Sequence, residues 1–167
     1  MDKMVTSGPG PESGDVACAE LWISCIEGPE IPDRPGRFIY RNAGNIVAPL
    51  DLSCLAAMDI AIRMFGVRKI VVCGHIECRC IEAASISGIA GQWLTPIKRI
   101  DSRVSFSGKA ENDSLKRQRS EENVIEQLRS AAVTSIVKGA AAAGTPIDLV
   151  GLLFDPGSQE YLTIIEA

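Results

Sequence analysis

The chain has 167 residues, of which 46% are hydrophobic and 23% are charged, so length and composition predict a globular protein with room for a real core. A net charge of −4 excludes a dominant nucleic-acid surface, because phosphate binding needs a clear excess of lysine and arginine. No apolar run reaches the roughly 18 to 20 residues that span a bilayer, which excludes a membrane-spanning helix.

The first segment, residues 1–17, is rich in glycine, proline and serine and has little to bury. We expect a flexible arm there, followed by a single domain over residues 18–167. The arm has no apolar stretch of the kind found in secretory signals, which predicts a cytoplasmic protein. In a reducing compartment cysteines are expected as thiols or metal ligands rather than disulfides. The six cysteines are at positions 18, 25, 54, 73, 78 and 80.

Strand and helix patterns alternate after the arm. Residues 19–27 (AELWISCIE), 36–44 (GRFIYRNAG) and 67–75 (VRKIVVCGH) are apolar runs with β-branched or aromatic members, which is typical of strands. Between the second and third runs, residues 50–66 predict an amphipathic helix. Its expected apolar stripe consists of Leu52, Leu55, Met58, Ile62 and Phe65.

The middle of the chain predicts helices of uneven quality. Residues 81–100 look helical but are interrupted by glycines and a proline, and residues 101–119 are polar enough for a solvated loop or an exposed helix. A long helix is expected to follow Ser120, which can cap it, and to run toward the alanine-rich stretch near Gly144.

The last two apolar runs, residues 146–155 and 160–166, predict a fourth and a fifth strand. Strands that alternate with helices indicate an α/β fold with a mainly parallel central β-sheet flanked by helices. In such sheets ligands bind just beyond the carboxyl ends of the strands. Residues at those ends are therefore the first candidates for a functional site.

Three potential metal ligands converge on that edge. Cys25 ends the first strand, His75 ends the third and is the only histidine, and Cys78 follows one turn later. Two cysteines and one histidine form a zinc ligand set that leaves a fourth position for water or substrate. A single buried cysteine is more often a core residue than a ligand, and a core role is expected for three further cysteines. These are Cys18, Cys54 and Cys73.

The residues around this set resemble the β-class carbonic anhydrases. That family carries a cysteine at the end of its first strand, then R-N-A-G-N, then H-x-x-C, which match Cys25, residues 41–45 and residues 75–78. Further matches are IVAP, EENVIEQLRS and VGLLFD, so the resemblance covers roughly residues 20–165 in order. It implies an α/β fold that assembles as dimers or multiples of dimers. It also implies that zinc-bound water or hydroxide adds to carbon dioxide.

The same resemblance assigns roles to the residues of the site. Zn²⁺ would be bound by Cys25, His75 and Cys78. The R-N-A-G-N turn would shape the site and offer backbone N–H groups. The site-shaping residues expected on this basis are Arg41, Asn42, Ala43, Gly44, Asn45 and Gly74.

The first motif of the chain departs from the family pattern C-x-D-x-R. In the family the Asp accepts a hydrogen bond from the zinc-bound water and the Arg holds that Asp away from the metal; here Glu27 and Pro29 occupy the two positions. Proline has no side-chain donor, so Glu27 would either ligate the zinc and close the site or be steadied by another arginine and act on the bound water. The candidate cations are Arg34, Arg37 and Arg79, of which Arg79 is nearest in sequence to the metal ligands.

Three functions remain open on these residues. The leading one is a zinc lyase that attacks carbon dioxide or a related small electrophilic carbon, with Glu27 and Arg79 as catalytic residues. The second keeps the metal but acts on carbonyl sulfide, carbon disulfide or a larger carbonyl compound. The third is a catalytically silent zinc protein that serves as an assembly subunit. The expected partners are a small-molecule substrate and further copies of the chain in a homodimer or larger oligomer, with no nucleic acid and no membrane.

Overall fold

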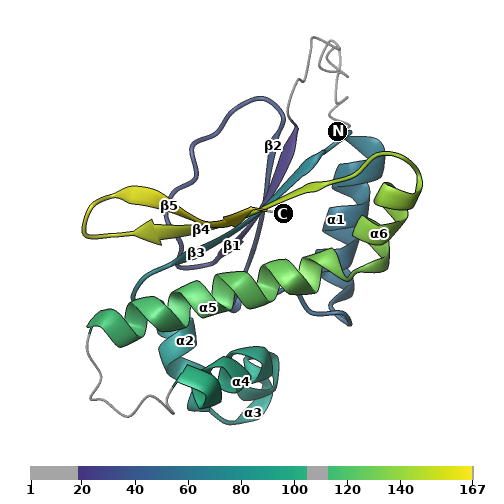
Figure 1. Ribbon diagram of the computed structural model, residues 1–167. Coiled ribbons are helices and arrows are strands. Elements are labelled where there is room, and N and C mark those ends of the chain that lie inside the picture. The colour runs from purple at the N-terminus through teal and green to yellow at the C-terminus, as the bar shows by residue number, and fades with distance from the viewer. Residues whose placement is uncertain (1–18, 105–112, 167) are drawn as a thin grey trace, which may run out of the picture.

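The computed structural model describes residues 19–104 and 113–166. The described strands form one five-stranded sheet in the order β2-β1-β3-β4-β5 (Figure 1). Their bounds are β1 Glu20–Cys25, β2 Arg37–Asn42, β3 Lys69–His75, β4 Asp148–Asp155 and β5 Glu160–Glu166. The first four strands run parallel and β5 runs antiparallel to β4, which confirms the predicted fold class. The predicted arm and Cys18 lie outside the described residues, and the division into arm and domain stays a prediction.

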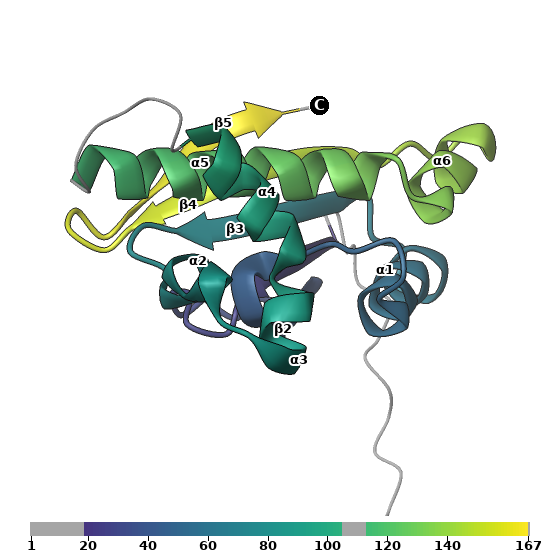
Figure 2. The ribbon, with the colours of Figure 1, turned by 90° about the horizontal axis from the view of Figure 1, so that it is seen from below.

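Most of the described helices lie on one side of this sheet. The α-helices are α1 Leu52–Met64, α2 Arg79–Glu82, α3 Gly88–Trp93, α4 Thr95–Val104, α5 Asp113–Ala132 and α6 Ser135–Ala142. Two short 3₁₀ helices are η1 Ala43–Asn45 and η2 Ala83–Ser85. Figure 2 shows α5 lying lengthwise along the sheet, with α2 toward one end, α3 and α4 near its middle, and α1 and α6 near the other end. In the ranges that the structure describes, no helix is both long and apolar enough to cross a bilayer.

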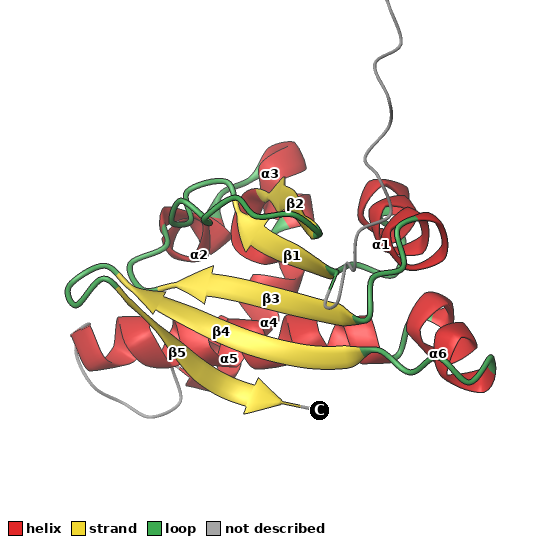
Figure 3. Cartoon of the chain, turned by 90° about the horizontal axis from the view of Figure 1, so that it is seen from above, coloured by secondary structure: helices red, strands yellow, loops and turns green. Residues whose placement is uncertain are grey.

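The opposite face of the sheet carries a second, smaller apolar cluster. Trp22, Val71 and Cys73 are buried there against Ile31, which belongs to the loop between β1 and β2. The half-buried neighbours of this cluster are Val150, Leu152 and Tyr161. In Figure 3 no helix of the described segments covers this face. Parallel sheets are normally covered on both faces, and here it is Val150, Leu152 and Tyr161 that stay partly exposed in one copy of the chain.

The apolar stripe predicted for α1 is only partly buried. Met58 is fully buried and Ile62 nearly so, but Leu52 is 79% exposed and Phe65 is 50% exposed. Leu52 opens the helix directly after its cap Asp51, and Phe65 follows the last helical residue, where it stacks on Phe38 of β2. Only the middle turns of α1 therefore pack into the core.

The long helix begins earlier than predicted and ends sooner. Ser120 is 2% exposed and lies inside α5, so it is not the helix cap. The polar run before it is helical because it contains good helix formers and an ion pair between Arg117 and Glu121, one turn apart at 2.8 Å. The helix ends at Ala132, and Thr134 begins a separate α6 by accepting a hydrogen bond from the Val137 N–H at 3.2 Å.

A close approach of α5 to the sheet sets the position of the site. A Cβ atom on Gly74 of β3 would lie 2.6 Å from Val124 Cγ2, and one on Gly151 of β4 would lie 2.9 Å from Val124 Cγ1. The two missing side chains let Val124 sit directly over both strands. As a result, α5 passes close to the carboxyl end of β3, where His75 stands.

Candidate metal centre

The carboxyl ends of β1 and β3 bring the predicted ligand set together. One ligand atom from each of Cys25, Glu27, His75 and Cys78 lies within 4.8 Å of all the others. Cys25 and Cys78 are buried, and their sulfur atoms are 3.7 Å apart. Two thiolates bound at about 2.3 Å to one tetrahedral zinc ion are separated by about 3.8 Å, so the observed spacing fits a shared metal.

His75 supplies the third atom with the orientation that metal binding needs. Its Nδ1 lies 3.2 Å from the carbonyl oxygen of Ile76, a contact in which Nδ1–H donates and Nε2 keeps its lone pair. The Nε2 atom is buried and has no hydrogen-bond partner. An orphaned acceptor next to two thiols is costly in a core but is what a cation would satisfy.

The contact between the two thiols shifts their pKa values in opposite directions. A hydrogen bond from Cys78 holds the pKa of Cys25 below its ordinary value despite burial, and backbone N–H groups of Glu27 and Gly44 lower it further. The pKa of Cys78 is raised, first by that same hydrogen bond and then by burial and the neighbouring negative charge. The pair thus carries one thiolate by itself, and a divalent cation would be needed to stabilise the second.

Glu27 stands at the rim of the set and is paired with Arg79. The Arg79 Nε–H donates to Glu27 Oε1, while Glu27 Oε2 lies 4.0 Å from Cys78 Sγ. The Glu27 side chain is 18% exposed and that of Arg79 is 83% exposed. A carboxylate near the ligands is therefore held at its outer oxygen by an arginine that follows Cys78 directly in the chain.

The other two candidate arginines have a different partner. Arg34 and Arg37 form ion pairs with Glu20 at 2.7 and 2.5 Å. Burial acts to raise the pKa of Glu20, but the hydrogen bonds from Arg37 and Arg34 outweigh it and lower that pKa. Neither arginine is paired with Glu27, so of the three candidates it is Arg79 that the structure places beside it.

Arg41 serves the main chain of the site. Its guanidinium donates to the carbonyl oxygens of Cys25 at 2.7 Å and Pro29 at 2.6 Å, which fixes the loop that carries Glu27. Gly28 in that loop has little room, because a Cβ there would lie 2.7 Å from Ser24 Oγ. The loop is thus tied down at both ends of the altered motif.

The rest of the R-N-A-G-N turn forms the inner wall. The Asn42 side chain bonds both the N–H and the carbonyl of Ile46, and the Ala43 carbonyl accepts a hydrogen bond from Trp93 Nε1 at 2.8 Å. Gly44 and Asn45 have φ of 81° and 48°, and the Gly44 N–H points at Cys25 Sγ at 3.4 Å. The turn therefore offers a backbone N–H to a ligand sulfur.

Three polar residues at the site were not predicted from the sequence. Cys80 lies with its sulfur 3.8 Å from that of Cys25, and burial, followed by the charge of Cys25, raises its pKa to about 11. Asn123 and Gln127 on α5 are each 1% exposed. Asn123 donates to the R-N-A-G-N turn, and Gln127 donates to Asn123 and accepts from the Val47 N–H. Their spacing of four residues, next to the apolar Val124 and Leu128, is a sequence signal that could have marked a buried polar pair.

Two of the three cysteines predicted as core residues lie in the described ranges, and both are core residues. Cys54 and Cys73 are fully buried, in separate apolar clusters. Burial raises the pKa of each thiol to about 12, so neither is a ready ligand.

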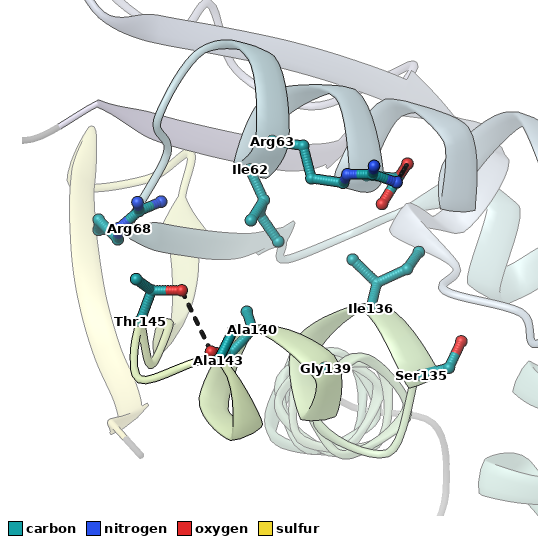
Figure 4. Close-up of a pocket in the computed structure, with 10 residues that line it drawn as sticks. Ile62, Arg63, Arg68, Ser135, Ile136, Gly139, Ala140, Ala143 and Thr145 are labelled. Carbon is teal, nitrogen blue, oxygen red and sulfur yellow. Dashed lines mark hydrogen bonds and ion pairs between the residues drawn. The ribbon is translucent and has the colours of Figure 1, made fainter.

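A hollow of about 320 Å³ opens beside the ligand set. Its lining residues are Glu27, Pro29, His75, Ile76, Glu77, Arg79, Phe154 and Pro156. A larger hollow, of about 460 Å³, lies between α1 and α6 near the amino end of β3 (Figure 4). Arg63, Arg68 and Thr145 are among its lining residues, which include no thiol and no imidazole. The described ligand set is thus served by the smaller hollow.

Comparison with known proteins places this site in a family. Residues 31–160 match the family model described as "Carbonic anhydrase". A carbonic anhydrase of Pseudomonas aeruginosa is 30% identical over 155 residues, which are 81% of this chain and 68% of the relative. One from Emericella nidulans is 30% identical over 139 residues, 80% of this chain. The chain spans 60% of that relative and 32% of a Candida albicans carbonic anhydrase.

Solved structures agree with the sequence comparisons. The β-carbonic anhydrase CafA of Aspergillus fumigatus superposes with a TM-score of 0.76 at 29% identity, covering 87% of this chain and 74% of that one. A structure from a study of two tetrameric β-carbonic anhydrases of Sordaria macrospora superposes with a TM-score of 0.80 at 25% identity, covering 90% and 83%.

Proposed function

The chain belongs to the β-class of the carbonic anhydrase family, and from this premise we propose that it is a zinc lyase that hydrates carbon dioxide. The observation that carries the proposal is the pairing of Glu27 with Arg79 beside the buried Cys25, His75 and Cys78. The carboxylate is already present in the altered first motif as Glu27, and Arg79 supplies, from a different place in the chain, the arginine that this motif lacks.

The three buried ligands fit a zinc ion by their donor types, their spacing and the orphaned Nε2 of His75. When bound, zinc would supply a water that is acidic enough to act as a nucleophile near neutral pH. Because two thiolates offset the charge of the dication, the surrounding residues have to assist that acidity.

Glu27 is the residue placed to give this assistance. With its outer oxygen bound to Arg79, the carboxylate keeps its inner oxygen facing the ligand set and can accept a proton there. Arg79 then acts as a positioning residue that keeps the carboxylate from ligating the metal. The Gly44 N–H and the Arg41-tethered loop complete the wall around it.

A second substrate class is favoured by the shape of the hollow. Its volume of about 320 Å³ lies in the range of pockets that hold small organic ligands, and Pro29, Ile76 and Phe154 give it an apolar side. Carbonyl sulfide or another small apolar electrophile would fit such a site with the same ligands. If the protein binds zinc but turns over neither substrate, the third function, a catalytically silent assembly subunit, is the one supported.

The experiment that tests the proposal measures zinc content and the rates of carbon dioxide hydration and carbonyl sulfide hydrolysis on one preparation. We expect one zinc per chain and measurable hydration, which falls about 10²- to 10⁴-fold in Glu27→Gln while the zinc is retained. Hydrolysis of carbonyl sulfide without hydration would replace the first substrate by the second. Zinc without either activity would contradict an enzymatic role.

We also propose that the chain forms a homo-oligomer. The support is the half-buried set of Val150, Leu152 and Tyr161 on a sheet face that no described helix covers, together with the tetrameric state named for the Sordaria relatives. Light scattering at micromolar concentration is expected to give at least twice the chain mass of 17.8 kDa. A monomer under these conditions would refute the proposal.

A further inference from the structure

A buried chain of amide groups connects α5 to the turn that touches the ligand set. The Asn123 Nδ2–H₂ group donates to the Gly44 carbonyl at 3.0 Å and to Asn45 Oδ1 at 3.3 Å. Gln127 Nε2 donates to Asn123 Oδ1 at 3.0 Å, and Gln127 Oε1 accepts from the Val47 N–H at 3.0 Å. Both side chains are 1% exposed, so these contacts replace the water that the amides lost on folding.

The turn that this chain holds has an unusual backbone. Gly44 and Asn45 both have positive φ, and a Cβ on Gly44 would lie 2.7 Å from Ile97 Cδ1. A left-handed pair of residues persists only where its surroundings determine it. Asn123 hydrogen-bonds to this pair at the Gly44 carbonyl and the Asn45 side chain, and Gln127 accepts from the Val47 N–H two residues after the turn.

The same glycine meets a ligand sulfur on its other side. The Gly44 N–H donates to Cys25 Sγ at 3.4 Å, while its carbonyl is held by Asn123. A hydrogen bond to a thiolate withdraws charge from the sulfur, so the sulfur donates less to a bound cation. That matters in a site with two thiolates, because each of them reduces the ability of the metal to acidify water.

We propose that Asn123 and Gln127 are positioning residues that set the donor strength of Cys25 toward the metal by aiming the Gly44 N–H at its sulfur. The inference rests on the proposed metal site. Asn123 acts directly on the Gly44 peptide, and Gln127 acts by holding Asn123 and the Val47 N–H. Loss of Asn123 is therefore expected to have the larger effect.

The test uses the full chain loaded with Co²⁺, whose thiolate-to-metal charge-transfer absorption reports the electron density on the ligand sulfur. Asn123→Leu removes the carbonyl and the NH₂ group of the side-chain amide at similar size. We expect the band to move to longer wavelength, because a sulfur that loses the Gly44 N–H donates more charge to the metal. Gln127→Met is expected to move it less, in the same direction. Activity of the zinc-loaded forms should fall by about 10- to 100-fold, the usual cost of losing a partner that orients a ligand.

Leu128→Ala is the matched control, since Leu128 is a buried residue of α5 that packs in the apolar core and has no side-chain group that could hydrogen-bond to the turn. It should destabilise the protein without moving the band. The inference is overturned if Asn123→Leu binds Co²⁺ and its charge-transfer band has the same wavelength as that of Leu128→Ala. Should Asn123→Leu not fold, an unmoved band in Gln127→Met overturns it. A wild type with no thiolate band would overturn the metal site itself, which separates the two failures.

Discussion

Replacement of Cys25 by alanine is expected to abolish metal binding while leaving the sheet folded. Its sulfur lies 3.7 Å from Cys78 Sγ and within the four-residue ligand set, so its loss leaves one thiolate and one imidazole to hold the ion. Affinity for zinc should fall by more than the about 10- to 100-fold that outer hydrogen-bond partners cost. The measurement is zinc content after dialysis against a competing chelator.

Cys73→Ala is the matched control for that change. Both cysteines are fully buried on neighbouring strands, but Cys73 packs in the apolar cluster on the other face and its pKa is raised to about 12. Its alanine variant should keep the metal. Cys80→Ser should keep it as well, because Cys80 is not among the four converging residues. Equal zinc content in Cys25→Ala and Cys73→Ala would show that the ion is bound elsewhere.

Arg79→Met is expected to close the site without harming the fold. The arginine side chain is 83% exposed and contributes little packing, but it holds Glu27 Oε1. Once released, the carboxylate can move onto the metal, because its other oxygen is already within 4.8 Å of every other ligand atom in the set. Hydration should fall by about 10²-fold or more, since both the open position and the proton acceptor are lost.

Azide binding to the Co²⁺-loaded protein gives a readout that does not depend on turnover: an open position binds the anion and a closed one does not. Arg63→Met is the control, because Arg63 is also an exposed arginine, 75% exposed and paired with Asp59 on α1. Pro29→Arg added to Arg79→Met restores the family's order of carboxylate and arginine and should recover part of the activity. Full activity in Arg79→Met alone would rule out the positioning role of that arginine.

The ends of the strands and the ligands could be predicted from the sequence because they depend on local patterns. The apolar run of β3 stops at Gly74 and continues into His75, which indicates the end of a strand. The candidate ligands could then be grouped because the carboxyl ends of parallel strands meet at one edge of the sheet. The sequence named Arg79 as one of three possible partners of Glu27, but the choice of Arg79 over Arg34 and Arg37 could not be made from local patterns. It depends on the turn at Glu77, which has φ of 61°, and on how far an arginine reaches across it.

The helices show the same limit. Ser120 is a residue type that often caps a helix. Here the run before it is helical as well, with an ion pair between Arg117 and Glu121 one turn apart, so Ser120 lies inside α5. Asn123 and Gln127 were missed because a polar residue on a helix is usually assigned to the solvent. Their burial follows only from the position of α5 over Gly74 and Gly151.

Zinc K-edge X-ray absorption of the purified chain tests the central claim most directly. The ligand geometry predicts two sulfur atoms at about 2.3 Å, with one imidazole nitrogen and one oxygen at about 2.0 to 2.2 Å. A shell with three sulfur atoms would show that Cys80 has entered the coordination sphere. A shell without sulfur, or a protein without zinc, would contradict the assignment of Cys25, His75 and Cys78 as the metal ligands.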